Sequence, residues 1–120
     1  MYSSDHTAKQ YDQELGAIRS RVLQMGGLVE TQIRGAILAF VDGDADQATQ
    51  VDAADHRVNA LEVGIDQDCA QIIAKRQPAA VDLRMLMGIS KIVTDLERSG
   101  DEASKIARMT RLIYGRDLRR

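Results

Sequence analysis

The strongest constraint on the fold is a recurrence of apolar residues every three or four positions along three long stretches of the chain. The stretches run from Leu15 to Phe40, from Val51 to Ile72 and from Val81 to Ile113. This spacing places the apolar side chains on one face of an α-helix. The sequence therefore predicts three long amphipathic helices.

Short breaking signals separate the three stretches. Asp42-Gly43-Asp44 is suited to end one helix and cap the next. Pro78 forces the residue before it out of helical geometry and favours the first turn of a new helix. Gly115 is expected to end the third helix. Helices of about 30 residues joined by such short turns must pack antiparallel, so we expect an all-α, up-down-up three-helix bundle.

The composition supports one helical domain. The chain has 120 residues, of which 3% are aromatic, with no Trp and one Pro, a balance that disfavours sandwiches and barrels. We expect the bundle at residues 8–115, a flexible leader at 1–7 and a basic tail at 116–120. The lone Cys69 and the lack of an apolar run of about 18 residues suggest a soluble, cytoplasmic protein without membrane insertion. A net charge of −2 gives no reason to expect nucleic-acid binding.

Several glycines fall inside the predicted helices. They are Gly26, Gly27, Gly64, Gly88 and Gly100. A glycine in a helix interior costs roughly 1 kcal/mol relative to alanine. We therefore expect neighbouring helices to approach closely at these positions.

Two acidic steps of the same form suggest where the chemistry lies. Glu62 and Asp66 are four residues apart, and 35 residues later Glu97 and Asp101 repeat the spacing. Residues four apart project from one helix face, so each pair can meet a hard cation from one side. The sequence predicts a metal site formed by these four carboxylates.

The first acidic step belongs to a longer oxygen-rich stripe. Asp55 and Asn59 precede Glu62 and Asp66 at offsets that keep all four within roughly 60° of one another around the helix. Because the second and third helices must be neighbours, their acidic stripes can converge, and a bound cation would remove the repulsion between them. The alternative, that these are ordinary solvated acids, stays open at this point.

Other kinds of site are not supported by the sequence. The segment from Asp42 to Asp46 imitates the start of an EF-hand loop, but Gln47 replaces the required glycine and Ala53 the bidentate glutamate. Neither His6 nor His56 follows a glutamate at the spacing of a di-iron site. No pairing of a nucleophile with a base is found, so we expect no catalytic residues.

The turn before the third helix and the helix itself contain two distinctive blocks. They read AKRQPAAVDLR at residues 74–84 and LERSGD at 96–101. Both resemble the PhoU family of bacterial phosphate-transport regulators, whose pattern is approximately RQP-x-x-x-DLR followed by LERIGD. Ser99 replaces the usual Ile and leaves both acids in place. Similar residues at 25–30 and 55–66 extend the resemblance over nearly the whole chain.

The resemblance implies a cytoplasmic regulator that represses phosphate-starvation signalling. It implies action between the ATPase subunit of the phosphate ABC transporter and the sensor histidine kinase. Family members carry metal ions on paired E(D)xxxD motifs, which correspond here to Glu62 with Asp66 and Glu97 with Asp101. Asp55 and Asn59 are expected as additional contributors. Oxygen ligands suit Mg, Mn, Ca and Fe alike, and tetrahedral Zn less well.

Length is the main departure from the family, whose chains are about twice as long and contain a second three-helix bundle. This chain is therefore expected to be an N-terminal half or a single-bundle member. In the second case the uncovered apolar surface predicts a homo-oligomer. Two other functions are alternatives. One is an accessory module of another phosphate permease, and the other is a chorismate-mutase-like helical enzyme, which would need inward-facing arginines around its dianionic substrate.

Overall fold

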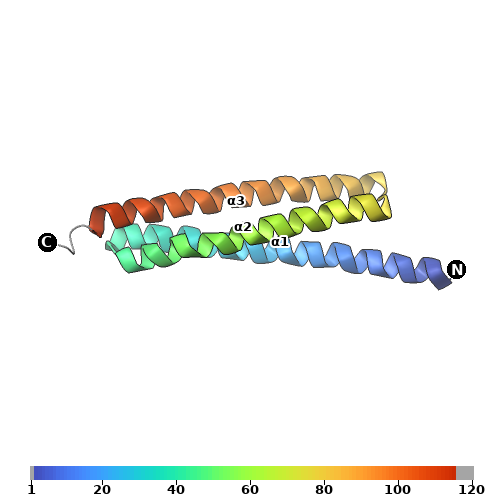
Figure 1. Ribbon diagram of the computed structural model, residues 1–120, viewed down its shortest axis with the longest axis horizontal. Coiled ribbons are helices and arrows are strands. Elements are labelled where there is room, and N and C mark those ends of the chain that lie inside the picture. Colours follow the sequence, from blue (N-terminus) through green and yellow to red (C-terminus); the bar gives the residue numbers. More distant parts are fainter. Residues whose placement is uncertain (1, 116–120) are drawn as a thin grey trace.

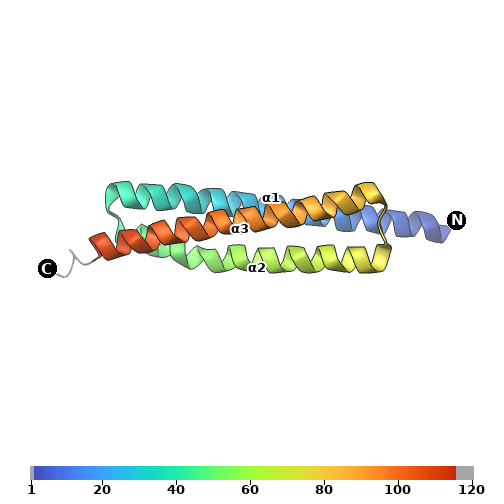
Figure 2. The ribbon, with the colours of Figure 1, turned by 90° about the horizontal axis from the view of Figure 1, so that it is seen from above.

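The computed structural model describes residues 2–115, with side-chain environments from residue 8 onwards. α1 spans Tyr2–Asp42, α2 spans Ala45–Arg76 and α3 spans Ala80–Tyr114. They run up, down and up a rod 73 Å long and 21 by 17 Å across (Figure 1). Each helix packs on both of the others, and Figure 2 shows α3 lying over the space between α1 and α2. The predicted antiparallel three-helix bundle is confirmed.

The two turns lie where the sequence predicted them. Gly43 adopts a φ of +66°, and Asp44 caps α2 by accepting a hydrogen bond from the backbone N–H of Gln47 at 3.0 Å. At the other end, α2 stops at Arg76, and Gln77 takes a left-handed φ of +48° just before Pro78. Both turns are therefore tight, which holds successive helices side by side.

The ends of the chain differ in part from expectation. α1 begins at Tyr2, within the segment 1–7 expected as a separate leader, because no glycine or proline interrupts the sequence before Gly16. The flexibility of that segment stays a prediction. α3 ends at Tyr114, before Gly115, as predicted. The basic tail at 116–120 lies outside the described residues.

Two groups of buried apolar residues fill the bundle. The larger contains mainly long aliphatic side chains: Leu15, Ile18, Met25, Val29, Val58, Ile65, Cys69, Ile72, Leu86, Ile89 and Val93. The smaller lies nearer the α1–α2 turn: Ala36, Ala39, Ala48, Val51, Ala103 and Ala107. Small side chains in the second group let the helices approach closely there. Over the described residues, no helix combines the length and the apolar content needed to cross a membrane.

The core of the alanine-rich half differs from the sequence prediction. Ile33, Ile37 and Phe40 belong to the first predicted stripe but are 38%, 50% and 45% exposed. Ile106 and Met109 of the third stripe are likewise exposed. The apolar band is wider than the face that the bundle buries, and alanines occupy the inner positions. These five residues, called here the α1–α3 apolar face, line shallow cavities between the two helices.

The expectation that five interior glycines mark close helix approaches is correct only for Gly100. A Cβ at the other four would meet either nothing within 4 Å or one ordinary contact. Gly35, which the sequence analysis did not single out, is a true close approach, because a Cβ there would lie 2.9 Å from Cγ2 of Val51. Glycine content alone therefore does not locate the helix crossings.

Candidate metal-binding site

Carboxylates from α2 and α3 come together on the surface along which these two helices pack, called here the α2–α3 groove. Glu62 on α2 is half-buried, and so is Glu97 on α3. Burial raises the pKa of Glu62, and the negative charges of Glu97 and Asp66 raise it further. Three of the four carboxylates predicted from the acidic steps are therefore electrostatic neighbours. Their role as metal ligands stays a prediction.

The remaining predicted ligands on this side are either engaged with another residue or exposed. Asp101 forms a 3.5 Å ion pair with Lys105, one turn further along α3. Hydrogen bonding to Glu102, followed by the charges of Glu102 and Asp101, raises the pKa of the Lys105 ammonium group. Asn59 and Asp66 are exposed. Asp101 would have to leave Lys105 before it could turn towards Glu62 and Glu97.

Asp55 is held by a residue of α1. Its Oδ1 atom accepts a hydrogen bond from Nε2 of Gln32 on α1 at 3.2 Å. Gln32 is only 2% exposed, and its Oε1 atom finds no hydrogen-bond partner among the described residues. The sequence analysis missed Gln32. Its position three residues after Val29 and four before Ala36, in the register of the buried face, was the available signal.

The acidic stripe ends at a basic pair. Nη1 of Arg108 and Nη2 of Arg111, both on α3, lie 3.1 and 2.8 Å from the two carboxylate oxygens of Asp52 on α2. This pairing neutralises Asp52 and separates it from the acids further along the groove. The uncompensated acidic part of the groove therefore begins at Asp55.

The predicted ligands suit a hard cation by their chemistry, but their side chains are not grouped so as to coordinate one. Among residues that the structure describes, no three His, Cys, Asp or Glu side chains are grouped so as to hold a metal ion. The six predicted ligands nevertheless offer carboxylate and amide oxygens, which Mg²⁺ and Mn²⁺ prefer. Gly100 lets the side chains of Gln32 and Asp55 pack against the α3 backbone, because a Cβ there would lie 2.8 Å from Oε1 of Gln32 and 3.3 Å from Oδ1 of Asp55. Side-chain rotation and bound water would have to complete the coordination of a cation here.

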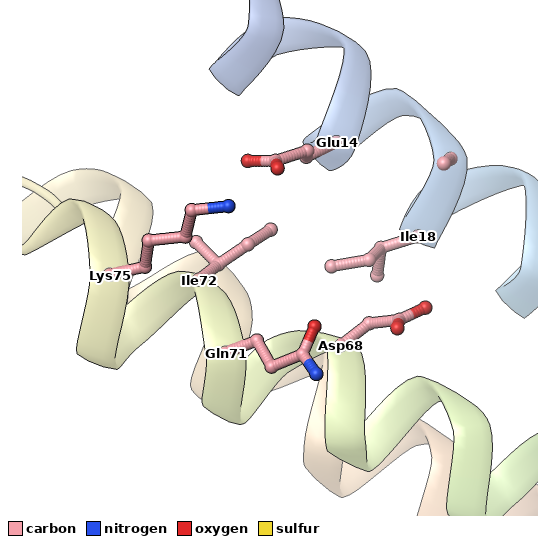
Figure 3. A pocket seen from close by; sticks show the side chains of 7 residues that line it. Glu14, Ile18, Asp68, Gln71, Ile72 and Lys75 are labelled. Atoms are coloured by element: carbon pink, nitrogen blue, oxygen red, sulfur yellow. The ribbon is translucent and has the colours of Figure 1, made fainter.

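A separate cavity of about 220 Å³ lies between α1 and α2, on another side of the bundle. Figure 3 shows Glu14 of α1 facing Lys75 of α2, with Asp68 further along the cavity. The acids here already have partners, because Arg76 bonds Glu14 at 3.0 Å and Arg21 bonds Asp68 at 2.5 Å. The hydrogen bond from Arg76 lowers the pKa of Glu14. This cavity is therefore a weaker candidate for a cation than the α2–α3 groove.

The chain is similar to known proteins over most of its length. Residues 22–110 match the family described as PhoU domain. The phosphate-specific transport system accessory protein PhoU homolog of Pseudomonas aeruginosa is 52% identical over 103 residues, which cover 86% of this chain and 43% of the relative. PhoU of Escherichia coli K12 is 50% identical over 103 residues, which again cover 86% of this chain and 43% of the relative.

A solved structure gives the same result for the fold. The crystal structure of PhoU from Pseudomonas aeruginosa matches with a TM-score of 0.85 and 48% sequence identity, over 88% of this chain and 51% of the other. A more distant relative, the PhoU homolog of Caulobacter vibrioides, is 37% identical over 95% of this chain. The chain spans about half the length of these relatives or less.

Proposed function

Because the chain belongs to the PhoU family, we propose that it regulates phosphate uptake and phosphate-starvation signalling as a non-enzymatic adaptor. In this role it contacts the ATPase subunit of the phosphate ABC transporter and the sensor histidine kinase in the cytoplasm. The observation that carries the proposal is the 52% identity, over 103 residues, to a protein named as a phosphate-specific transport system accessory protein.

The bundle suits an adaptor better than the enzyme considered as an alternative. A chorismate-mutase-like site needs arginines that face inwards, whereas the groove between α2 and α3 is lined by carboxylates. Arg108 and Arg111 are instead half-exposed and bound to Asp52. An accessory module of another phosphate permease would also be a non-enzymatic binding protein. The two roles differ in the protein that is bound, which is a permease in one case and the ABC transporter with its kinase in the other.

A regulatory test uses a bacterium that lacks its own PhoU and carries a reporter gene under a phosphate-starvation promoter. Expression of this chain is expected to lower reporter activity in phosphate-rich medium, relative to an empty vector. Crosslinked material from the same cells should contain the transporter ATPase subunit and the kinase. A reporter that stays fully active while the folded chain accumulates would refute the regulatory role. Recovery of a phosphate permease alone would favour the alternative.

We also propose that the α2–α3 groove binds a divalent cation. Glu62 and Glu97 would hold it, with Asp66, Asp101, Asp55 and Asn59 as further donors. The cation would supply positive charge that removes the repulsion between carboxylates of the two helices. Support comes from the raised pKa of Glu62 and from the oxygen-only donor set, which suits Mg²⁺, Mn²⁺ or Fe²⁺ better than tetrahedral Zn²⁺.

The α1–α3 apolar face supports the proposal of self-association. Five large apolar side chains on one side of a small protein are a common mark of a protein interface. We expect the chain to sediment at micromolar concentration as a dimer or larger, rather than at its own 13.2 kDa. Replacing Ile37 by Glu should return it to a monomer, because a buried unpaired charge opposes association.

The matched control for that experiment is Leu23→Glu. Leu23 is also on α1 and is 77% exposed, but it lies outside the α1–α3 apolar face. This variant should keep the wild-type mass. A wild-type chain that is strictly monomeric would contradict the proposal, and so would a dimer that Leu23→Glu dissociates and Ile37→Glu does not.

A further inference from the structure

The outer groove between α1 and α3, called here the α1–α3 groove, has a hollow end and a bulky end. Two shallow cavities, of about 530 and 460 Å³, follow one another along it. The first begins at Gly26, and the second is lined by Phe40, Ile106 and Met109. A Cβ added at Gly26 or Gly27 would meet no neighbouring atom within 4 Å. One end of the groove therefore lacks side-chain bulk, while the other end projects large apolar side chains.

Nothing inside the bundle explains the two adjacent glycines at the hollow end. A glycine in a helix interior costs roughly 1 kcal/mol relative to alanine, and a close approach of another helix is the usual compensation. Gly100 shows such an approach within the bundle, whereas Gly26 and Gly27 do not. Their bare backbone faces outwards, so it can accept a large side chain from another molecule.

Charged residues flank the groove in two matching pairs. Glu30 and Arg34 on α1 are four residues apart and form a 3.1 Å ion pair. Arg98 and Glu102 on α3 repeat the spacing with the charges in the opposite order. These four residues, called here the rim charges, have side chains that are between 63% and 71% exposed. They are therefore available to a second molecule that covers the groove.

The two pairs of rim charges are centred at one height of the rod. Their midpoints are positions 32 and 100. Gln32 and Gly100 lie at the same level, because a Cβ at Gly100 would be 2.8 Å from Oε1 of Gln32. A two-fold axis that crosses the groove at this level would lay each helix against its counterpart in a second copy, running in the opposite direction. The acid of each pair then meets the base of the same pair in the other copy.

The same axis brings the bulky end of one copy to the hollow end of the other. Ile37 and Phe40 lie five and eight residues after position 32 on α1, whereas Gly27 and Gly26 lie five and six residues before it. The large side chains of one copy thus lie over the bare backbone of its partner. A parallel dimer, with its axis along the rod, would also join opposite charges. It would, however, set the two bulky ends against each other and leave the two hollow ends unfilled.

We propose that two copies of this chain pair antiparallel through the α1–α3 groove, with the bulky end of each copy filling the hollow end of the other. The proposal rests on the proposed self-association and specifies its geometry. The rim charges include two of each sign, which suits a second copy better than a strongly acidic or strongly basic partner. They also fix the register, because a shifted pairing would bring like charges together.

The test exchanges charges between copies and measures molecular mass by sedimentation equilibrium. Arg34→Glu and Glu30→Arg should each raise the dissociation constant of the dimer about 10-fold, since each makes two attractive contacts repulsive. An equimolar mixture of the two variants should recover association, because both contacts of a mixed dimer again join an acid and a base. Arg57→Glu, at an exposed position of α2, is the control and should leave the dissociation constant unchanged.

A second mixture distinguishes the antiparallel dimer from the parallel one. In a parallel dimer α1 of one copy faces α3 of the other, so Arg34 would meet Glu102 of its partner. A mixture of Arg34→Glu with Glu102→Arg would then recover association. In the antiparallel dimer this mixture keeps two repulsive contacts, and we expect it to associate as weakly as either variant alone.

The fit of the bulky end into the hollow end is tested by Gly26→Leu. This variant should keep its helix content by circular dichroism, because the space beside Gly26 is open in the single chain, but it should weaken dimerisation at least about 10-fold. Gly16→Leu is the matched control. Gly16 also has no neighbouring atom within 4 Å, but it lies sixteen residues before position 32, whereas α1 of the partner ends ten residues after it. This control should dimerise like the wild type.

The results that would overturn the proposal can be told apart from a failure of self-association itself. A wild-type chain that stays monomeric would refute self-association and this arrangement together. If the wild type dimerises and only the mixture of Arg34→Glu with Glu102→Arg recovers, self-association stands and the dimer is parallel. Recovery in neither mixture, or an unchanged dissociation constant for Gly26→Leu, would also show that the copies do not pair as proposed.

Discussion

Replacing both Glu62 and Glu97 by glutamine is expected to weaken Mn²⁺ binding by roughly two orders of magnitude or more, since affinity for hard cations depends strongly on the number of charged ligands. The two side chains come from different helices and are electrostatic neighbours in the α2–α3 groove. Glutamine keeps the shape and removes the charge. Calorimetric titration measures the effect. Glu30→Gln is the control, because Glu30 pairs only with Arg34 on the surface of α1.

The same double variant should be slightly more stable than wild type when no cation is present. The raised pKa of Glu62 means that the folded chain holds this proton at pH values where the unfolded chain has lost it. Stability from this group is therefore complete below the ordinary glutamate pKa and falls as the pH rises through the folded pKa. At neutral pH, removing the like charges should add roughly a few tenths of a kcal/mol. The gain should vanish in acid, and a clear loss of stability at neutral pH would contradict this account.

Ile65→Ala is expected to have the largest effect on folding, a loss of about 2–5 kcal/mol in the free energy of unfolding. Ile65 is completely buried in the larger core group and lies on α2 between Glu62 and Asp66. Truncation leaves a cavity under the helix segment that carries the first acidic step. Urea unfolding followed by circular dichroism measures the loss.

Val63→Ala provides the comparison, because Val63 is two residues away on the same helix and 54% exposed. A substitution at such a surface position should change the unfolding free energy by no more than about 0.5 kcal/mol. Similar losses for Ile65→Ala and Val63→Ala would show that the acidic face of α2 is not supported as described.

Much of the fold could be predicted from the sequence because the boundaries of the helices are set by residues at those boundaries. Gly43, with its left-handed φ of +66°, and Pro78 end helices through their own backbone preferences, and each lies at the predicted boundary. Gly115 directly follows α3, although its φ of −64° is still helical. Which side of a wide apolar band is buried is instead decided by the neighbouring helices. That is why Ile33 and Ile37 were assigned to the core, although alanines fill the inner positions at that level.

In the candidate site too, some features follow from sequence spacing, whereas others depend on how the helices pack. The spacing of Glu62 and Glu97 on neighbouring helices was sufficient to predict that they approach each other. The pairing of Asp101 with Lys105 competes with its predicted role and depends on side-chain geometry. Gln32 was missed because periodicity on α2 and α3 says nothing about which residue of α1 reaches between them. Only the packed bundle brings Gln32 to Asp55.

The most direct test of the account is the location of a bound paramagnetic ion by NMR. Substoichiometric Mn²⁺ added to the ¹⁵N-labelled chain should selectively broaden amide signals around Asp55, Glu62 and Glu97. Signals around Glu14, at the cavity between α1 and α2, should stay sharp. Broadening centred on that cavity, or sharp Glu62 and Glu97 signals when other parts of the chain broaden, would contradict a cation site between α2 and α3.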